Sequence, residues 1–409
     1  MKKQIALSIL ALGMLGTGCT GTSDDSKNSS QMASTASLAG SGSQNPAPSL
    51  DSSSKSDSTE PNTTGTFQTL ASQPASLETM FDSIALDGSV MVDAVSGVDG
   101  KFFFQTLQNG LSPVLFPTSM EYAWDSRTGM LETLKTRDPQ SLARVWDFCQ
   151  KDGVLYESVL EIENDQLLNN IYANDQLVFS KPCAWFEHAA RFAFVGGKLQ
   201  FLTAYTENDQ SHLLLASLDH DQVEEIYRLD GDGSTREENL QTGILHQQSP
   251  GRICFLTTNN GEQTLVFYDG NSILEAPFEG RVWQIVPLQS GTLVCQAVED
   301  EAGNYLYPWY WYPAGSQEAS EIGNWDQVPL LDVNAGAEIG DSFYITGTEG
   351  LAYKISYAPE GLTLETIDTL PSYYCSFFRL DQDYPLIFID GLRQPDGTYQ
   401  KPQAMKAPL

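Results

Sequence analysis

The sequence predicts an all-β protein whose main domain is a β-propeller of seven four-stranded blades, with six or eight blades as the alternatives. Three observations indicate this fold. Short apolar runs alternate with turn residues through the second part of the chain, and no part of it keeps the apolar period of a helix. The same set of runs also recurs roughly every 40–55 residues, an interval typical of four-stranded propeller blades.

Two apolar runs joined by a tight turn open each of the seven repeats. Dipeptides such as Asp-Gly, Gly-Gly, Pro-Gly and Ser-Gly occupy most of these turns, and they suit a hairpin because they tolerate positive φ. We therefore interpret each pair of runs as the first two strands of a blade. The seven turns centre on Gly100, Gly153, Gly197, Gly251, Gly291, Gly340 and Tyr384.

A third and a fourth run complete each of the first six repeats. The seventh repeat offers only GTYQK, residues 397–401, as a third strand. We expect residues 78–88, which precede the first hairpin, to supply its fourth strand, because pairing the two ends of the domain closes the ring and leaves no exposed edge. The six third strands end near Trp124, Tyr172, Leu218, Tyr268, Tyr312 and Tyr357.

The N-terminus has the features of a secretory signal. Two lysines precede an apolar stretch, residues 5–15, which is too short to cross a bilayer as a helix. Small residues then lead to Cys19, a pattern that resembles the lipobox of bacterial lipoproteins. The resemblance implies that residues 1–18 are a lipoprotein signal peptide and that Cys19 carries acyl chains such as palmitate, which anchor the protein outside the cytoplasm on a bacterial membrane. An ordinary signal peptide cleaved near Gly18 or beyond is the alternative.

Residues 19–76 are interpreted as the lipidated cysteine followed by a Ser/Thr-rich tether. From position 20 to position 66 the chain has no aromatic residue, no Val and no Ile. Such a segment cannot bury enough apolar surface to offset its conformational entropy. We expect it to be disordered and to reach roughly 35–40 Å on average. The propeller domain is assigned to residues 77–409.

The formal net charge of −31 restricts the classes of partner. Such an acidic chain is unsuited to nucleic acid and to docking flat on anionic lipid, since both are negatively charged. Five cysteines follow Cys19, with no CxxC pair among them. Their number and spacing indicate neither a disulfide framework nor a zinc site, and we expect mostly free, buried thiols.

One segment resembles a repeat of a propeller family. AWDSRTGMLETL, residues 123–134, is similar to the AxDxxTGxxxW repeat of pyrroloquinoline-quinone-type propellers at its Ala, Asp, Thr and Gly positions, but it lacks the final Trp. The resemblance implies a propeller fold, and no set of quinone or metal ligands accompanies it. Three Trp-Asp pairs resemble those of WD40 repeats, at positions 124–125, 146–147 and 325–326.

The segment NYLYPWYWYPAG, residues 304–315, concentrates six aromatic side chains. In the repeat register it is the third strand of the fifth blade, and neighbouring blades cover both faces of such a strand. Tyr312 falls where most repeats end their third strand on an aromatic residue, so we interpret the segment as packing. A glycan-stacking patch at Trp309 and Trp311 is the alternative, and it would make the protein a glycan-binding or glycan-active propeller.

Acidic loops form the candidate partner site. The turns between second and third strands and the links between blades open on the same face of a propeller, and several of them are rich in carboxylates. We predict that this face binds a cationic segment of another protein of the cell envelope. The candidate residues are Glu207, Asp209, Asp230, Asp232, Glu299, Asp300 and Glu301.

Two alternatives stay open for these loops. Either they are simply solvated, or their carboxylates converge on Ca²⁺. In DGDGSTREENLQ, residues 230–241, the first, third and fifth positions match an EF-hand series, but Thr235 and Gln241 stand where that loop needs Gly and Glu. We therefore assign no metal ligands and expect no cofactor.

Signatures of the common enzyme classes are missing from the sequence. It has no GxSxG elbow, no HExxH, no P-loop and no GxGxxG, and its four histidines fall at no ligand spacing. We therefore expect a binding or scaffold module rather than an enzyme, and we assign no catalytic residue. Glycoside chemistry by carboxylates from different blades, or a propeller with a bound cofactor, are the other hypotheses.

Overall fold

The computed structural model describes the body of the chain between residues 67 and 406, within one folded unit, Gly65–Leu409. Cys19, the predicted signal peptide and the predicted tether up to residue 66 lie outside the described residues, as do 407–409. Within the body the description leaves out residues 85, 87, 109–115, 139–140, 184–188, 209, 231–251, 260–261, 301–302, 304, 325–330, 341, 348–350, 359–360, 370–374, 382–383, 390, 392–393 and 396–397.

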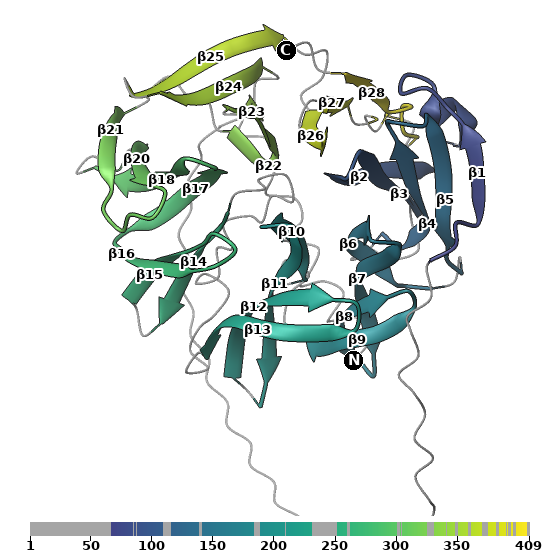
Figure 1. Cartoon of the computed structure of the whole chain (residues 1–409), viewed down its shortest axis with the longest axis horizontal. Helices are drawn as coiled ribbons and strands as arrows, with labels where there is room; N and C mark the ends of the chain where they lie inside the picture. Colours follow the sequence, from purple (N-terminus) through teal and green to yellow (C-terminus); the bar gives the residue numbers. More distant parts are fainter. Residues whose placement is uncertain are drawn as a thin grey trace, which may run out of the picture. The chain divides into compact units, whose positions relative to one another are not determined.

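Seven antiparallel sheets are arranged around a common axis (Figure 1), which confirms the predicted all-β propeller with seven four-stranded blades. In the blades whose first strand is described, that strand lies innermost, and the strands then pair in chain order, with the short β19 of blade 5 pairing beside β18. The described residues include one short helical element, the 3₁₀ helix η1 (Met80–Ser83). None of their helices is long and apolar enough to cross a membrane.

The strands of the first three blades are complete in the described residues. Blade 1 contains β2 (Val90–Val98), β3 (Lys101–Gln108), β4 (Thr118–Asp125) and β5 (Met130–Thr136). Blade 2 contains β6 (Arg144–Lys151), β7 (Val154–Glu163), β8 (Gln166–Ala173) and β9 (Gln176–Pro182). Blade 3 contains β10 (Arg191–Val195), β11 (Lys198–Glu207), β12 (Gln210–Asp219) and β13 (Gln222–Asp230).

The other four blades follow the same order. Blade 4 shows β14 (Ile253–Asn259), β15 (Glu262–Tyr268) and β16 (Ile273–Phe278); its expected first strand lies outside the described residues. Blade 5 contains β17 (Arg281–Leu288), β18 (Gly291–Glu299), the short β19 (Tyr305–Leu306), β20 (Pro308–Pro313) and β21 (Ser320–Asn324). Blade 6 contains β22 (Leu331–Ile339), β23 (Ser342–Gly347), β24 (Leu351–Ala358) and β25 (Gly361–Thr369). Blade 7 shows β26 (Cys375–Asp381), β27 (Tyr384–Ile389) and β28 (Gln403–Lys406).

Each blade packs against both of its neighbours through a hydrophobic cluster. Seven clusters each combine residues of two adjacent blades, so the core is a ring of interfaces rather than one central mass. Blades 7 and 1 meet where the ring of Phe378 lies edge-on to Phe102, with 5.1 Å between ring centroids. Because both faces of a blade are covered, β3 is fully buried at the successive positions Phe102, Phe103 and Phe104.

The first hairpins have the backbone that their turn residues predict. Positive φ angles occur at Gly100, Gly153, Gly197 and Gly340, while Gly251 lies outside the described residues. Gly291 differs, because it is the first residue of β18 and has no positive φ. A Cβ at this position would lie 2.4 Å from the Trp311 ring and 2.5 Å from the Tyr312 carbonyl oxygen. Close packing therefore requires this glycine, and the turn does not.

The ring closes differently from our expectation. The third strand of blade 7 is β28, so its assignment to residues 397–401 is wrong. The described part of 78–88 forms η1 and no strand beside β28. Its backbone hydrogen bond to the end of the chain is the one in which Tyr399 N donates to Gly88 O at 2.8 Å. Instead, Met80 and Phe81 enter the hydrophobic cluster that joins blades 1 and 7. Apolar packing thus supplies the contact that we expected from a strand.

The folded body also begins earlier than residue 77. β1 (Ala71–Pro74) pairs antiparallel with β5 and adds a fifth strand to the outer edge of blade 1. Phe67 N donates to Gly153 O of blade 2 at 2.7 Å. The boundary at residue 76 is therefore corrected. A polar segment joins the fold here because an edge strand offers unpaired backbone groups, and pairing with them requires no buried side chain: all four side chains of β1 are exposed.

The segment that resembles the AxDxxTG repeat forms the turn between β4 and β5. Asp125 Oδ1 accepts hydrogen bonds from the backbone N–H groups of Arg127 (2.8 Å) and Thr128 (3.2 Å), and Gly129 has positive φ. Asp269 caps a turn of blade 4 in the same way. The motif therefore stabilises a local turn, which explains its residues without any cofactor.

Replacing Asp125 with alanine should lower the free energy of unfolding by about 1 kcal/mol, because two backbone N–H groups lose their acceptor. Urea denaturation of the full chain measures this change. Asp125→Asn keeps a side-chain oxygen in the same place and should retain most of the stability. Equal losses in the two variants would contradict the capping role.

Candidate functional site

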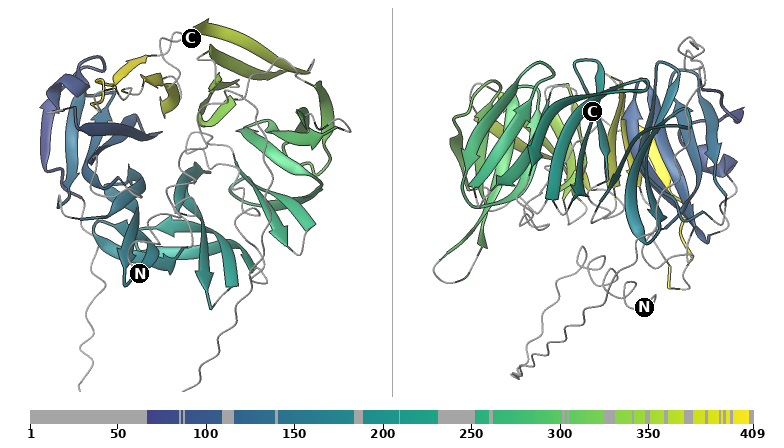
Figure 2. Two further views of the ribbon diagram at one scale, coloured as in Figure 1. Left: turned by 180° about the vertical axis from the view of Figure 1, so that it is seen from behind. Right: turned by 90° about the horizontal axis from the view of Figure 1, so that it is seen from below.

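The strand order defines two faces of the ring, and Figure 2 shows the blades edge-on. Because neighbouring strands are antiparallel, the turns between second and third strands lie at the same end of the blades as the links from one blade to the next. We call this end the loop face; it includes the turns around 163–166, 207–210 and 299–305. The opposite end, which carries the first hairpins and the turns between third and fourth strands, is the hairpin face.

The structure describes only some of the predicted acidic residues, and those that it describes belong to loop-face segments. Glu299 is exposed at the end of β18, and Asp300 follows it half-buried. Glu163 and Asp165 of the β7–β8 turn are also exposed and extend the acidic rim to blade 2. The candidates that lie outside the described residues are Asp209, Asp232 and Glu301.

Glu207 and Asp230 meet on one corner of blade 3, where each has a cationic partner. Glu207 Oε1 accepts a hydrogen bond from Lys181 Nζ at 2.9 Å. Asp230 Oδ1 lies 2.7 Å from Arg228 Nε and 2.6 Å from His212 Nδ1. The hydrogen bonds from Arg228 and His212 lower the pKa of Asp230, and Lys181 lowers the pKa of Glu207. Since the chain balances both charges itself, they attract an external cation less than Glu163 or Glu299 do.

The described residues form no calcium site. No group of three or more His, Cys, Asp or Glu among them could hold a metal ion. Asp230, the first position of the calcium-like loop, is engaged by Arg228 and His212. The positions that follow it in that loop, 231–241, lie outside the described residues. The five cysteines of the body are buried and free, as the sequence predicts.

Two arginines that the sequence analysis did not select lie on the axis side of the loop face. Arg144 and Arg191 begin β6 and β10, the innermost strands of blades 2 and 3. Arg144 Nη2 donates to Asp93 Oδ2 at 2.7 Å. The guanidinium carbon of Arg191 lies 4.7 Å from the centroid of a Trp146 ring. No sequence motif marks this set of Asp93, Arg144, Trp146 and Arg191, because its members come from three different blades.

Most of the exposed large apolar side chains of the described residues also lie on the loop face. Eight large hydrophobic side chains are exposed among the described residues, and five of them belong to loop-face segments. Scattered single exposures are ordinary, whereas apolar side chains grouped on one surface mark interaction sites. Three of the five lie at blades 1 and 2, namely Phe116, Leu142 and Ile162, and the other two lie at blade 5, namely Val298 and Leu306.

The aromatic segment of blade 5 packs between blades. Trp309 and Trp311 of β20 are only 2% and 4% exposed. They belong to the hydrophobic cluster that joins blades 5 and 6, together with Phe343 and Tyr353. Neither indole offers a face to which a sugar could stack, so the glycan-stacking alternative at these two residues is wrong. The physical reason is that the neighbouring blade 6 covers both tryptophan side chains.

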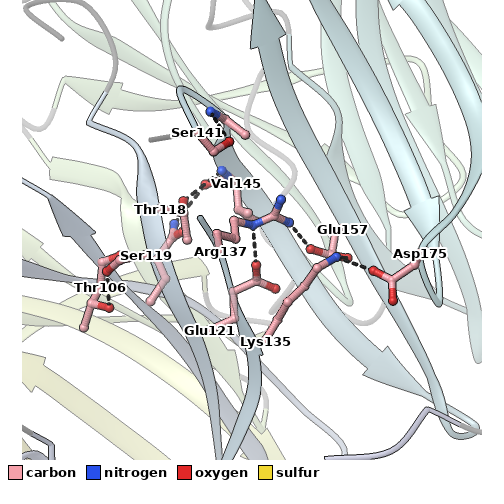
Figure 3. A network of polar contacts seen from close by, with 12 residues as sticks. Thr106, Thr118, Ser119, Glu121, Lys135, Arg137, Ser141, Val145, Glu157 and Asp175 are labelled. Atoms are coloured by element: carbon pink, nitrogen blue, oxygen red, sulfur yellow. Dashed lines mark hydrogen bonds and ion pairs between the residues drawn. The ribbon is translucent and has the colours of Figure 1, made fainter. Parts of the chain in front are cut away.

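A buried ionic network joins blades 1 and 2 (Figure 3). The side chains of Glu121 on β4 and Glu157 on β7 are 0% exposed. Arg137 donates to both, with Nε 2.8 Å from Glu121 Oε1 and Nη2 bonded to Glu157 Oε1. Lys135 Nζ donates to Glu157 Oε2 at 2.7 Å and to Asp175 Oδ1 at 2.5 Å. Two cations from the outer edge of blade 1 thus hold carboxylates of both blades.

Burial changes the chemistry of Glu121. Desolvation and then the neighbouring Glu157 carboxylate raise the pKa of Glu121 to about 8, against the opposing effects of Arg137 and Lys135. Its Oε2 is buried without a hydrogen-bond partner among the described residues. Paired carboxyl groups with a shifted pKa can serve acid–base catalysis, but no solvent-exposed surface of this pair could meet a substrate. The network therefore acts in joining the two blades.

Comparison with known proteins shows no family for this chain. No model of a known protein family matches the chain, and no curated protein matches its sequence. Among solved structures, a chain of the mitotic checkpoint complex is 12% identical, over 87% of this chain and 99% of its own, with a TM-score of 0.43. An oligogalacturonate lyase in complex with manganese is 11% identical, over 78% and 90%, with a TM-score of 0.45.

BamB from Moraxella catarrhalis is 10% identical, over 76% of this chain and 85% of its own, with a TM-score of 0.35. Likenesses at such identities concern the fold alone. The strand order and the seven inter-blade clusters establish that fold from the chain's own residues. The protein is a seven-bladed β-propeller.

Proposed function

We propose that the protein is a binding or scaffold module of the cell envelope, which engages a protein partner through its loop face. The observation that carries this proposal is that five of the eight exposed large apolar side chains of the described residues lie on the face that also presents the exposed carboxylates of Glu163, Asp165 and Glu299. A partner with apolar and cationic side chains would bury the former and pair with the latter. Such a mixture suits a protein surface better than a small ligand.

Anchoring through lipidated Cys19 is part of the proposal and rests on the lipobox-like N-terminus. Phe67 N is bonded to Gly153 O, and Gly153 lies in a first hairpin on the hairpin face. The described N-terminal segment therefore leaves the loop face uncovered.

We propose a non-catalytic role for the same face. The paired carboxyl groups Glu121 and Glu157 are inaccessible, and the buried His212 is bonded to Asp230. Neither set combines an exposed nucleophile or base with a recess for a substrate, which an active site needs.

Photo-cross-linking tests this function. The photo-reactive residue p-benzoylphenylalanine is placed at Ile162 or Leu306 of the full-length chain, in the cells that produce it. Irradiation should give a discrete protein adduct from each position, because both side chains are exposed on the loop face. In a Glu163→Lys/Glu299→Lys background the adduct yield, measured by immunoblot, should fall by roughly fivefold or more, since the reversed charges repel a cationic partner.

Matched controls use the hairpin face. Leu177 is 50% exposed, close to the 49% of Ile162, and Asp221→Lys/Glu224→Lys makes the same change in net charge. Equal adducts from Leu177, or an equal loss with the control charges, would rule out the loop face as the partner surface. In the same cells a Cys19→Ser variant should leave the membrane fraction, and unchanged membrane retention would contradict the lipid anchor.

A further inference from the structure

Arg191 is an unusual cation in this acidic chain. It forms no ion pair within the part of the chain that the structure describes, whereas Arg137, Arg144 and Arg228 each bind a carboxylate there. Its guanidinium instead lies over the Trp146 ring, with 4.7 Å from Cζ to the centroid. Contact with an indole holds the guanidinium in one orientation and leaves its N–H groups available to a further acceptor.

The carboxylates nearest to Arg191 already have other partners. Asp93 Oδ2 accepts hydrogen bonds from Arg144 Nη2 at 2.7 Å and from Gln105 Nε2 at 2.9 Å. Asp147 is buried, and its Oδ2 accepts the backbone N–H of Phe192 at 2.8 Å. Arg191 is nevertheless exposed, so an acceptor from outside the chain can reach it.

Surrounding protein also modifies Arg191. Desolvation lowers the pKa of its guanidinium against the opposing charges of Asp147 and Asp93, and the charge of Arg144 acts in the same direction as desolvation. Arg191 is thus reachable by solvent and yet partly surrounded by protein atoms, as expected for a position near the ring axis rather than on the open rim. Charge-assisted hydrogen bonds are stronger in such a position than in bulk water.

An apolar strip separates this cationic position from the acidic rim. Arg144 pairs with Leu160 across the antiparallel β6–β7 ladder. Leu142, two residues before Arg144, and Ile162, two residues after Leu160, therefore both lie toward the loop face. Phe116 joins them, because its carbonyl oxygen accepts Arg144 Nη1 at 3.4 Å. All three side chains are exposed. Glu163 and Asp165 follow directly beyond Ile162.

We propose that Arg191, supported by Trp146 and Arg144, is a subsite for a carboxylate side chain of the partner protein. The loop face of blades 1–3 then has a polar order: cationic near the axis, apolar across the strip of Phe116, Leu142 and Ile162, and acidic at the rim. A bound segment has the complementary order, with acidic residues at the axis, apolar residues in the middle and basic residues at the rim. This inference rests on the proposed function, and it adds the partner's chemistry and direction.

Peptide selection tests the subsite. A library of random peptides of about twelve residues is selected on the purified full-length chain, and affinities are measured by fluorescence anisotropy. The selected sequences should combine Asp or Glu at one end with Leu, Ile or Phe next to it. Arg191→Glu should weaken their binding by about tenfold or more, and Leu142→Ser/Ile162→Ser should weaken it to a similar degree. Circular dichroism confirms that each variant is folded.

The controls repeat both chemical changes on the hairpin face, as Lys198→Glu and Leu177→Ser, and should leave binding unchanged. Failure to select any peptide, a pool without acidic residues, or indifference to Arg191→Glu would overturn the subsite. Displacement by inorganic phosphate together with full binding to Leu142→Ser/Ile162→Ser would identify a small-anion site and also overturn it. Glu163→Lys separates the two proposals: if it has no effect while Arg191→Glu does, the acidic rim fails and the subsite stands.

Discussion

Replacing Arg137 with methionine should lower the free energy of unfolding by about 3 kcal/mol, because it leaves two buried carboxyl groups without their shared cation. Glu121 would lose its 2.8 Å hydrogen bond, and Glu157 would keep only Lys135. Both side chains are 0% exposed, so water cannot replace the guanidinium. Urea denaturation of the purified full chain measures the change.

Two further variants separate the buried charge from the lost bulk of the arginine. Arg137→Met/Glu121→Gln/Glu157→Gln leaves neither position with a carboxyl group that can ionise and should recover a large part of the stability, since no buried carboxylate then lacks its guanidinium partner. Arg228→Met breaks an exposed ion pair with Asp230 and should cost less than about 1 kcal/mol. If Arg137→Met were no worse than Arg228→Met, the network would not join blades 1 and 2 as the structure indicates.

Stability should also fall as the pH rises from about 5 to above 8. The pKa of Glu121 is raised from the usual 4.5 of a glutamate to about 8. Between these two values the folded protein binds a proton at Glu121 that the unfolded chain has released. Proton release therefore favours unfolding, and the free energy of unfolding decreases with pH in this window. The expected decrease is on the order of a few kcal/mol, because each unit of pKa difference corresponds to about 1.4 kcal/mol.

Urea denaturation at a series of pH values from about 5 to 9 gives this dependence. Glu121→Gln has no carboxyl group to ionise at this position, so its profile should be flatter than that of the natural chain. Glu132→Gln, which removes a carboxylate from a more exposed ion pair with Lys101, is the matched control and should keep the slope. A slope unchanged by Glu121→Gln would assign the pH dependence to other groups.

The fold was accessible to sequence reasoning where local signals decide the structure. Turns such as the one at Gly153 need residues that accept positive φ, and β3 needs apolar residues at successive positions because both its faces are buried. The ends of the domain were harder to predict. β1 pairs with β5 through backbone groups alone, so no side-chain pattern marks it, and ring closure by Met80 and Phe81 depends on a blade at the other end of the chain.

The candidate site shows the same division. Acidic loops could be recognised by composition, but composition does not reveal that Lys181 already binds Glu207 or that Arg228 binds Asp230. The approach of Arg191 to Trp146 joins two blades, and it has no signature in either repeat. Residues that meet only across a blade interface are far apart in the chain, so no fixed spacing in one sequence marks them as partners.

By itself, the sequence determined the all-β class, the repeating blades and the packing role of the aromatic segment, because turn chemistry and apolar patterning act over a few residues. Only the tertiary structure decided which charges stay available on the loop face and which are buried between blades 1 and 2. Ion pairs such as Arg137 with Glu157 bring together residues of different sheets. Which charged residues form such pairs depends on how neighbouring blades pack, and that geometry exists only once the ring has formed.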